Sequence, residues 1–514
     1  MKYSFDMYIR SKKNASGSES IQIIEKRRGK YRVLESIGSA KTKDEKKKLF
    51  KKAELRKNEL EPPKLFSFVS EQDVRICDFL TGAAEPSIEN IGPELILGKI
   101  FEDIGLGEIS EPLFRHIVLA RLTYPVSKLK TADYLFQHKG ISIDVSSIYR
   151  FLDRFYAQHK DKVENIIYKN SKKILGEIHV VFYDMTTLYF EAEDEDDLRK
   201  IGFSKDGKFQ CPQIMIGLLI GENGYPIGYE VFEGNTFEGK TILPVIRGIE
   251  KKYNLPKPIV VADSGLLSKI NIKELEKDGY SFILGARIKN ETETMKRKIL
   301  ENTKHLRDGK TARITKLDAT HLIISFSLKR ARKDAYNREK GVQKLREKIS
   351  GGYLTKAHIN NRGCNKFLIL GGETISVSLN TAKIEADAEW DGLKGYITNI
   401  SSMTDDEIIE KYQHLWKIEN AFRISKTDLR IRPIFHRKEE RIKAHLCIAF
   451  AAYAVYKELE RLLGINEIGI SPAKAIELSK TIFQITFLLP DSERPISIFN
   501  RLSDLQKKLL NLKT

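Results

Sequence analysis

The sequence predicts an α/β fold, in which a mixed sheet is covered by helices, preceded by a helical region and interrupted by a β-rich insertion. Apolar residues recur at helical spacing from Pro93 to about Gly176, and at Ile178 the pattern changes to short β-prone runs. Three such runs are followed by alternating helix and strand patterns, which is an α/β order. With 514 residues, of which 41% are hydrophobic, the chain has room for two to four domains.

Residues 1–60 form a basic N-terminal segment. They hold 18 Lys/Arg and 8 Asp/Glu, in a chain whose formal net charge is +18. Two β-prone runs between residues 20 and 37, separated by an Arg-Gly-Lys turn, predict a hairpin. Residues 41–60 predict a helix, either a solvated linker or an arm that contacts phosphates. The concentration of positive charge favours a polyanionic partner, nucleic acid first.

Residues 61–175 are expected to form a helical DNA-binding region. The stretch SKLKTADYLFQHKGISIDVSSIYRFLDRF predicts a helix, a turn at Gly140 and a second helix, with Ser146 or Ser147 as its N-cap. This arrangement is compatible with a helix-turn-helix, and equally with an ordinary helix pair.

Residues 176–289 predict the first part of the core. The runs IHVVFYD, QIMIGLLIG and PIGYEVFEG predict strands, and a helix, the strand PIVVADS, a helix and the strand YSFILGAR follow. This order suits an RNase H-like fold. Residues 290–400 predict an insertion domain, residues 401–460 the second part of the core, and residues 461–514 a helical C-terminal tail.

Two carboxylates follow apolar strand patterns in the predicted core. Asp184 ends the run VVFYD and Asp263 ends IVVAD, and α/β proteins place ligands at the carboxyl ends of such strands. The alternative is that each Asp caps the following turn or helix. The residues after Asp184 are expected to continue the strand.

A third carboxylate, Glu419, lies in a helical pattern. Tyr412, Glu419 and Lys426 recur every seven residues and would share one helix face. The alternative is an amphipathic helix with a surface line from Glu to Lys. Three acids fit a two-metal site, because hard divalent cations need several oxygen ligands.

The chain resembles insertion-sequence transposases of the DDE superfamily, the group with a β-rich insertion between the second Asp and the Glu. The resemblance rests on DMTTLYFE, GFSKDGK, PQIMIGLLIGENGYPIGYEVFEGNT, VVADSGL and YQHLWKIENAFRISKTDLRIRPIFH, which cover most of residues 178–445 in the family's order. It implies DNA cleavage and transfer of the 3′ ends to target DNA, with terminal inverted repeats and target DNA as partners and a homodimer that joins two ends.

The resemblance also implies roles for individual residues. Asp184, Asp263 and Glu419 would be catalytic and would hold two Mg²⁺ ions, for which Mn²⁺ could substitute. Tyr412 and Lys426 match the signature Y-x2-R-x3-E-x6-K, whose basic members contact DNA. The Arg position is Leu415 here, and Lys417 and Arg423 on neighbouring turns could replace it. Ser264 is a second departure, because related sequences commonly have Arg directly after the second Asp.

Two other functions stay open from the sequence: an RNase H-like nuclease without strand transfer, and an inactive DNA-binding protein derived from a transposase. The four cysteines form no CxxC pair, so a zinc site is not expected. The N-terminus lacks the apolar core of a signal peptide, and the longest apolar run, Leu446 to Tyr456, is too short to span a bilayer. The expectation is a cytoplasmic protein without a membrane partner.

Overall fold

A computed structural model describes residues 6–27, 29–60, 71–82, 87–266, 268–316, 320–352, 360, 363–371, 376–489 and 494–513. The chain divides into two compact units, residues 1–85 with 487–495, and residues 86–486 with 496–514. None of the helices in the described ranges is both long enough and apolar enough to cross a membrane.

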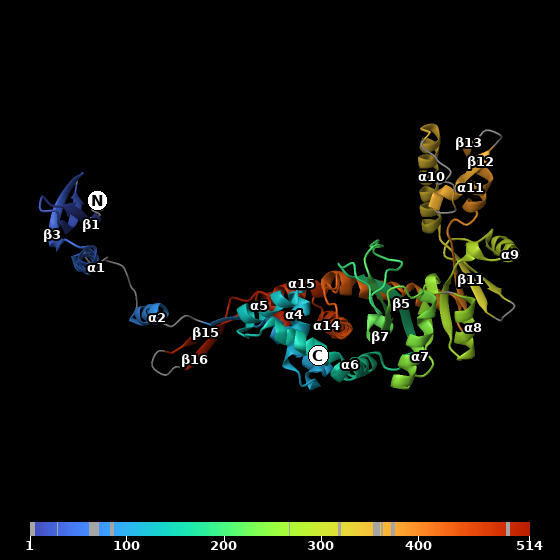
Figure 1. The fold of residues 1–514 in the computed structure, drawn as a ribbon, viewed down its shortest axis with the longest axis horizontal. Coiled ribbons are helices and arrows are strands. Elements are labelled where there is room, and N and C mark those ends of the chain that lie inside the picture. The colour runs from blue at the N-terminus through green and yellow to red at the C-terminus, as the bar shows by residue number, and fades with distance from the viewer. Residues whose placement is uncertain are drawn as a thin grey trace. The chain divides into compact units, whose positions relative to one another are not determined.

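The first unit contains an antiparallel sheet with a helix against it (Figure 1). The strands are β1 (Asp6–Lys13), β2 (Glu19–Arg27) and β3 (Lys30–Ala40), and the helix is α1 (Lys43–Leu60). The predicted hairpin is the β2–β3 pair, and β1 adds a third strand on the other side of β2. Ile21, Ile23 and Ala53 are buried where α1 meets the sheet, so this small unit has an apolar centre of its own. The unit also includes α2 (Glu71–Gly82).

The second unit is built around an eight-stranded mixed sheet in the order β10-β11-β14-β9-β8-β5-β6-β7. Its core strands are β5 (Val180–Tyr189), β6 (Gln213–Ile220), β7 (Pro226–Glu233), β8 (Ile259–Ala262) and β9 (Phe282–Ala286). β5, β6 and β7 are antiparallel neighbours, whereas β8 runs parallel to both β5 and β9. The RNase H-like mixed sheet predicted from the sequence is therefore confirmed.

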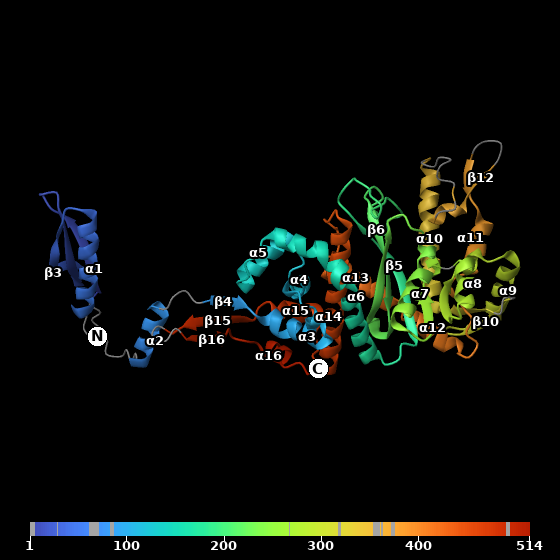
Figure 2. The ribbon, with the colours of Figure 1, turned by 60° about the horizontal axis from the view of Figure 1, so that its bottom comes forward.

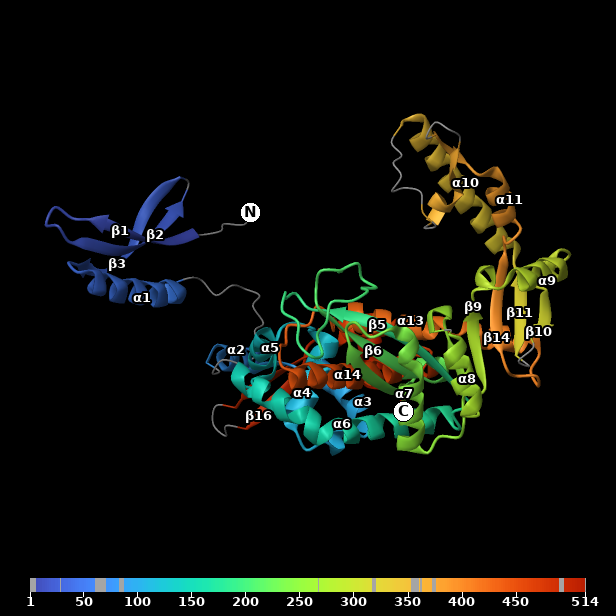
Figure 3. The same cartoon turned by 45° about the vertical axis from the view of Figure 1, so that its right-hand side comes forward.

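The two faces of this sheet are covered by different helices, because side chains alternate along a strand. Val181 and Tyr183 of β5 join the apolar cluster formed with α7 (Ile242–Tyr253) and α8 (Lys269–Lys277), which Figure 3 shows beside the strands. Val180 and Phe182 join the opposite cluster, with α12 (Asp405–Gln413) and α13 (Trp416–Arg423). The sheet is thus the middle of three layers.

Part of the predicted insertion continues the core sheet. β10 (Thr311–Thr315), β11 (His321–Phe326) and β14 (Leu393–Thr398) extend it beyond β9, and α9 (Glu293–Thr303) packs on them. Further elements among the described residues of the insertion are α10 (Leu328–Ser350), the 3-10 helix η8 (Gly363–Phe367), the pair β12 (Leu368–Gly371) and β13 (Ser376–Leu379), and α11 (Thr381–Ala388). They have a separate apolar cluster around Val342 and Phe367.

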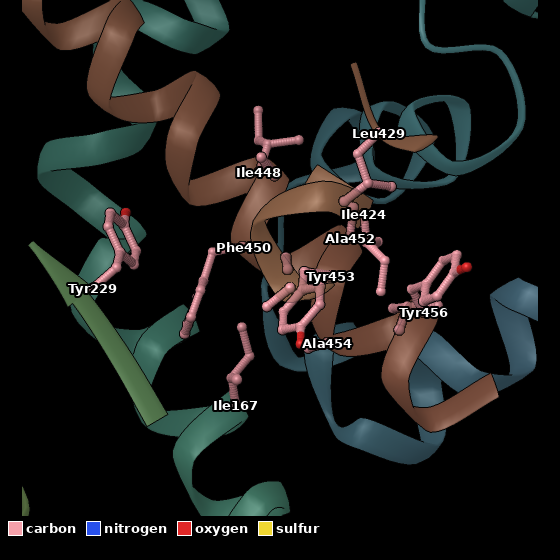
Figure 4. Close-up of a cluster of buried hydrophobic side chains, with 14 of the residues drawn as sticks. Ile167, Tyr229, Ile424, Leu429, Ile448, Phe450, Ala452, Tyr453, Ala454 and Tyr456 are labelled. Atoms are coloured by element: carbon pink, nitrogen blue, oxygen red, sulfur yellow. The ribbon is translucent and has the colours of Figure 1, made fainter. Parts of the chain in front are cut away.

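Two long helices form the other large apolar centre. α6 (Val145–Leu175) packs against α14 (Glu439–Ile465), with α3 (Lys99–Ile104) and α4 (Pro112–Thr123) beside α14. Figure 4 shows Ile167 of α6, Tyr229 of β7 and Phe450 of α14 in this cluster. α14 carries buried alanines and large apolar residues around its whole circumference, so neighbouring elements pack on all of its sides. α14 is therefore a buried helix behind the sheet.

The predicted helix pair before α6 is present. α5 (Lys128–Lys139) ends at Gly140, whose φ of +64° is readily accessible to glycine, and α6 begins after an N-cap at Asp144. The N-cap prediction at Ser146 or Ser147 was therefore wrong, since both serines lie inside the first turn.

The C-terminal tail is only partly helical. It contains α15 (Pro472–Ser479) and α16 (Asp504–Leu510), and between them β15 (Phe483–Leu488) and β16 (Pro495–Phe499). β15 pairs with β4 (Ser87–Asn90), as can be followed in Figure 2. The alternation of apolar and polar residues in both runs explains why strands form in a tail expected to be helical. The domain boundaries predicted from the sequence stay predictions.

Candidate functional site

Asp184 lies in β5 and Asp263 directly follows β8, and these two strands are parallel neighbours. The register pairs Val180 with Ile259 and continues to Tyr183 with Ala262, so Asp184 and Asp263 are the next residues on the two strands. Asp263 follows the end of β8, as predicted. Asp184 is the last residue of the apolar run VVFYD, but it is not the end of the strand. β5 continues to Tyr189, because β6 pairs with it along that length. The carboxyl end of β8 thus brings the two acids to one point of the sheet.

The carboxylate of Asp184 is partly buried and faces a lysine. Lys205 Nζ lies 3.7 Å from its Oδ1 and 2.9 Å from Oε1 of Glu238. The same ammonium donates a hydrogen bond of 2.6 Å to the backbone oxygen of Met185. Burial raises the pKa of Asp184 to about 6, Lys205 opposes the rise, and the negative charges of Glu238 and Asp263 add to it. Asp184 therefore lies where a cation is electrostatically favoured.

Asp263 is held from the opposite side by Tyr412. The Tyr412 hydroxyl donates a hydrogen bond of 3.0 Å to Oδ1 of Asp263, and the tyrosine is only 5% exposed. The ammonium of Lys394 lies 4.6 Å from the centre of the Tyr412 ring. This hydrogen bond ties helix α12 to the end of β8 and fixes the orientation of the Asp263 carboxylate.

Glu419 is exposed on α13, which packs on β5. Its charge acts on Lys394, whose pKa is lowered mainly by burial and by Arg330, while Asp263 and Glu419 oppose that shift. Across the described part of the chain, no three His, Cys, Asp or Glu side chains lie close enough together to hold one metal ion. The structure therefore brings Asp184 and Asp263 to adjacent positions and leaves Glu419 on a neighbouring helix.

The segment with Tyr412, Glu419 and Lys426 is not one regular α-helix. Between α12 and α13, the amides of Leu415, Lys417 and Ile418 bond to carbonyls three residues earlier, and Ile424–Asp428 forms a π-helical turn. These changes in pitch shift the seven-residue spacing away from a single stripe. Tyr412 is buried, Glu419 is exposed, and the side chain of Lys426 is 11% exposed.

The predicted DNA-binding residues of this segment occupy different surroundings. Lys426 Nζ lies 3.3 Å from both carboxylate oxygens of Asp206, which also pairs with Arg432. Lys417 donates to Asn223 at 3.4 Å. The side chain of Arg423 is 58% exposed and donates to Asn420. Of these three cations, Arg423 presents the most surface to a ligand.

A hollow of about 410 Å³ adjoins Asp263 and Tyr412. Its cationic lining includes Arg287, Arg330 and Lys394, which suits a negatively charged ligand. The sequence interpretation assigned no role to these cations. Arg330 lies in α10 and Lys394 lies in β14.

Lys205 and Glu238 were also missed as neighbours of Asp184. Lys205 lies in GFSKDGK and Glu238 directly follows GNTF, two segments that carried the family resemblance without a role for either residue. Their position beside Asp184 became visible only with the fold.

The chain resembles several solved structures of transposases at low identity. The piggyBac transposase synaptic complex with hairpin DNA is 10% identical, with a TM-score of 0.38 and coverage of 77% of this chain and 82% of that one. The Mos1 transposase paired-end complex with the left transposon end is 13% identical, with a TM-score of 0.16 and coverage of 45% and 71%. No curated protein matches the chain.

The match to a protein family carries the assignment, because these TM-scores are too low to support one. A family model described as the transposase DDE domain matches residues 176–455. This range includes β5, β8 and α13, and therefore Asp184, Asp263 and Glu419. Since the match covers more than half of the 514 residues, the chain belongs to the transposases with a DDE domain, enzymes that cut DNA in transposition.

Proposed function

We propose that this transposase cleaves DNA at the ends of its insertion sequence and transfers the 3′ ends to target DNA, with Asp184, Asp263 and Glu419 as metal-binding residues. One observation carries the proposal: Asp184 in β5 and Asp263 directly after β8 follow the paired residues Tyr183 and Ala262 of two parallel strands, and the helix with Glu419 packs on β5. Family membership supports the same three residues, because the matched range contains them all.

The residues fit a pair of divalent cations, for which we propose Mg²⁺. Carboxylate oxygens are the hard ligands that Mg²⁺ prefers, and the Lys205 ammonium already lies beside Asp184 and Glu238. When bound, two such ions would supply charge stabilisation and activation of the attacking oxygen in phosphodiester chemistry. Asp184 and Asp263 would hold them from the sheet and Glu419 from α13.

The protein's own residues would orient the carboxylates and the DNA. Tyr412 restrains Asp263 through its hydroxyl, and Lys394 and Arg330 would attract a phosphate into the hollow beside them. Lys417, Arg423 and Lys426 remain proposed DNA contacts, as does Tyr412 itself. Binding of two ends at once is the basis for proposing a homodimer.

A DNA assay tests this function. The protein is incubated with Mg²⁺, a labelled duplex that carries the end of the element, and a target plasmid. Cut and joined products are expected, whereas cut products alone would indicate a nuclease and a band shift alone an inactive binding protein. Asp184→Ala, Asp263→Ala and Glu419→Ala should each abolish cleavage and leave DNA affinity nearly unchanged, because affinity rests mainly on Lys and Arg. Any one of these variants that still cuts removes its residue from the site.

A further inference from the structure

A second cationic hollow, of about 360 Å³, is not lined by Asp184, Asp263 or Glu419. It is enclosed by the end of α4, the start of α5, α6, α14 and the segment 430–436. Its lining includes Arg121, Lys128, Lys130, Arg430 and Arg432, and none of the described residues that line it is an Asp or Glu. Of these cations, Arg432 has an acidic partner in Asp206. The hollow is thus strongly positive and lacks a carboxylate in its wall.

Arg121 is a buried lining residue of this hollow, and its hydrogen-bond partners are neutral groups. It is 6% exposed, its guanidinium lies 3.4 Å from the backbone oxygens of Leu429 and Arg430, and Nη2 lies 3.3 Å from Nδ1 of His445. Nε2 of His445 lies 3.1 Å from the backbone oxygen of Ile431. His445 can therefore donate through Nε2 and accept from Arg121 through Nδ1 as a neutral ring, which leaves the charge of Arg121 uncompensated.

Lys128 is the second buried cation of the hollow. It is 6% exposed, and among the described residues none accepts a hydrogen bond from its ammonium. Burial lowers its pKa well below the usual value, and the charge of Arg121 lowers it further. Burial, with Lys128 and Arg121, likewise lowers the pKa of His436 to about 3. Burial is the main cause of both shifts, and the neighbouring cations add to them.

The acid that acts on His436 already has a basic partner. Asp153 opposes the shift of His436, but it accepts bonds of 2.5 and 2.8 Å from Arg441. A buried cation without an acidic partner is costly, so a protein that keeps two of them gains from an anionic ligand. A guanidinium and an ammonium beside the first residues of helix α5, where Ser127 also lines the hollow, suit the oxygens of a phosphate.

We propose that this hollow binds a phosphate group, and that in the working protein the phosphate belongs to the DNA backbone. The identification of DNA as the source rests on the proposed function, whereas affinity for inorganic phosphate does not. The wall formed by residues 430–436 follows directly on the segment that contains Lys426, so a phosphate held here would anchor DNA beside that segment.

The first experiment uses inorganic phosphate and the full chain, without metal or DNA. Thermal unfolding is followed in a phosphate series against NaCl at equal ionic strength. Phosphate should raise the midpoint of the wild type beyond the NaCl effect. Lys128→Met should unfold at a higher temperature than the wild type without phosphate, because it removes an unpaired buried charge, and should bind phosphate roughly tenfold more weakly. Lys172→Met, which removes an exposed lysine of α6, is the matched control.

Lys130→Gln keeps the test decisive if Lys128→Met fails to fold, because Lys130 is exposed and lines the same hollow. It should weaken phosphate binding by a smaller factor. The proposal is overturned if phosphate stabilises the wild type no more than NaCl does, or if Lys130→Gln and Lys128→Met bind phosphate like the control.

The second experiment identifies the source of the phosphate. The affinity for end-bearing duplex DNA is measured across a salt series for the wild type and the three variants. A slope that falls by about one unit in Lys128→Met, and not in Lys172→Met, assigns the phosphate to DNA. An unchanged slope, with phosphate binding weakened as expected, keeps the site and assigns it to free phosphate. Neither result depends on cleavage, so a failure of the proposed catalytic function would be seen separately.

Discussion

The Tyr412 hydroxyl donates a 3.0 Å hydrogen bond to Asp263 and so joins helix α12 to the end of β8. A carboxylate restrained in this way needs little reorganisation when it binds a cation. Tyr412→Phe should keep the buried ring and lose only this bond. We expect cleavage to fall about tenfold and half-saturation by Mg²⁺ to shift upward. Mg²⁺ titration of the cleavage rate measures both, and Tyr396→Phe, a neighbouring buried tyrosine, is the control. Equal losses in the two variants would contradict a specific role for Tyr412.

The Lys205 ammonium lies between Asp184 and Glu238, where it would compete with a divalent cation. In Lys205→Met the competing charge is gone, so the protein should bind Mg²⁺ several-fold more tightly while the metal-free form loses about 1 kcal/mol of unfolding free energy. Thermal unfolding in a Mg²⁺ series measures both effects without DNA. Lys208→Met is the control, because Lys208 belongs to the same loop and lies over the Tyr189 ring. Weaker binding in Lys205→Met would instead show that the lysine organises the carboxylates for the metal.

His436 should make the fold sensitive to acid. Its pKa is lowered to about 3 by burial, whereas the unfolded residue titrates near 6.5, so between these values the unfolded chain binds a proton that the folded chain does not. Unfolding free energy must then fall as the pH drops below about 6.5, by about 2 kcal/mol at pH 5 from this residue. Urea unfolding at pH 8 and pH 5 should show a smaller acid loss in His436→Gln than in the wild type. The exposed His305 gives the matched control, His305→Gln, which should behave like the wild type.

The core strands could be predicted because their apolar runs are local. Val180 to Tyr183 and Ile259 to Ala262 are short, β-branched or aromatic, and followed by an acid, and the sheet places them as neighbours. The sequence also predicted that the strand continues past Asp184, and the structure confirms it. How far the strand extends depends on its partner. β6 pairs with β5 as far as Tyr189, and a loop separates the two strands in the sequence. The periodicity of one strand does not reveal such a partner.

Contacts between segments far apart in the chain could not be predicted from the sequence. β14 pairs with β9 across the predicted insertion, so three strands between residues 290 and 400 extend the core sheet. Lys205 meets Asp184 and Glu238 through a loop, and Arg121 meets His445 from a helix 324 residues away. Charged residues of this kind follow no helical or strand period, because their positions are decided by which acid or carbonyl the fold brings near them.

Lys426 is predicted to position DNA through its charge, although it is bound to Asp206 in the present structure. The ammonium lies 3.3 Å from both oxygens of Asp206 and is partly buried, which lowers its pKa, while Asp206 opposes that shift. Two roles follow from this contact: Lys426 leaves Asp206 to bind a phosphate, or it neutralises Asp206 so that the DNA path stays positive. Lys426→Ala should weaken binding of end DNA in either case, and a direct phosphate contact should also lower the salt slope by about one unit. Lys426→Arg should keep much of the affinity if charge is what matters, although its geometry differs.

The double variant Asp206→Asn with Lys426→Ala separates the two roles of Lys426. If the lysine only neutralises Asp206, removal of both charges should restore most of the affinity for end DNA, because no unpaired acid remains beside Arg432. If Lys426 contacts a phosphate, the double variant should stay weak and keep the lowered slope. The measurements are binding isotherms for end DNA at several salt concentrations, together with cleavage rates. An unchanged slope and unchanged affinity in Lys426→Ala, with cleavage lost, would show that Lys426 acts in the chemical step, contrary to the prediction.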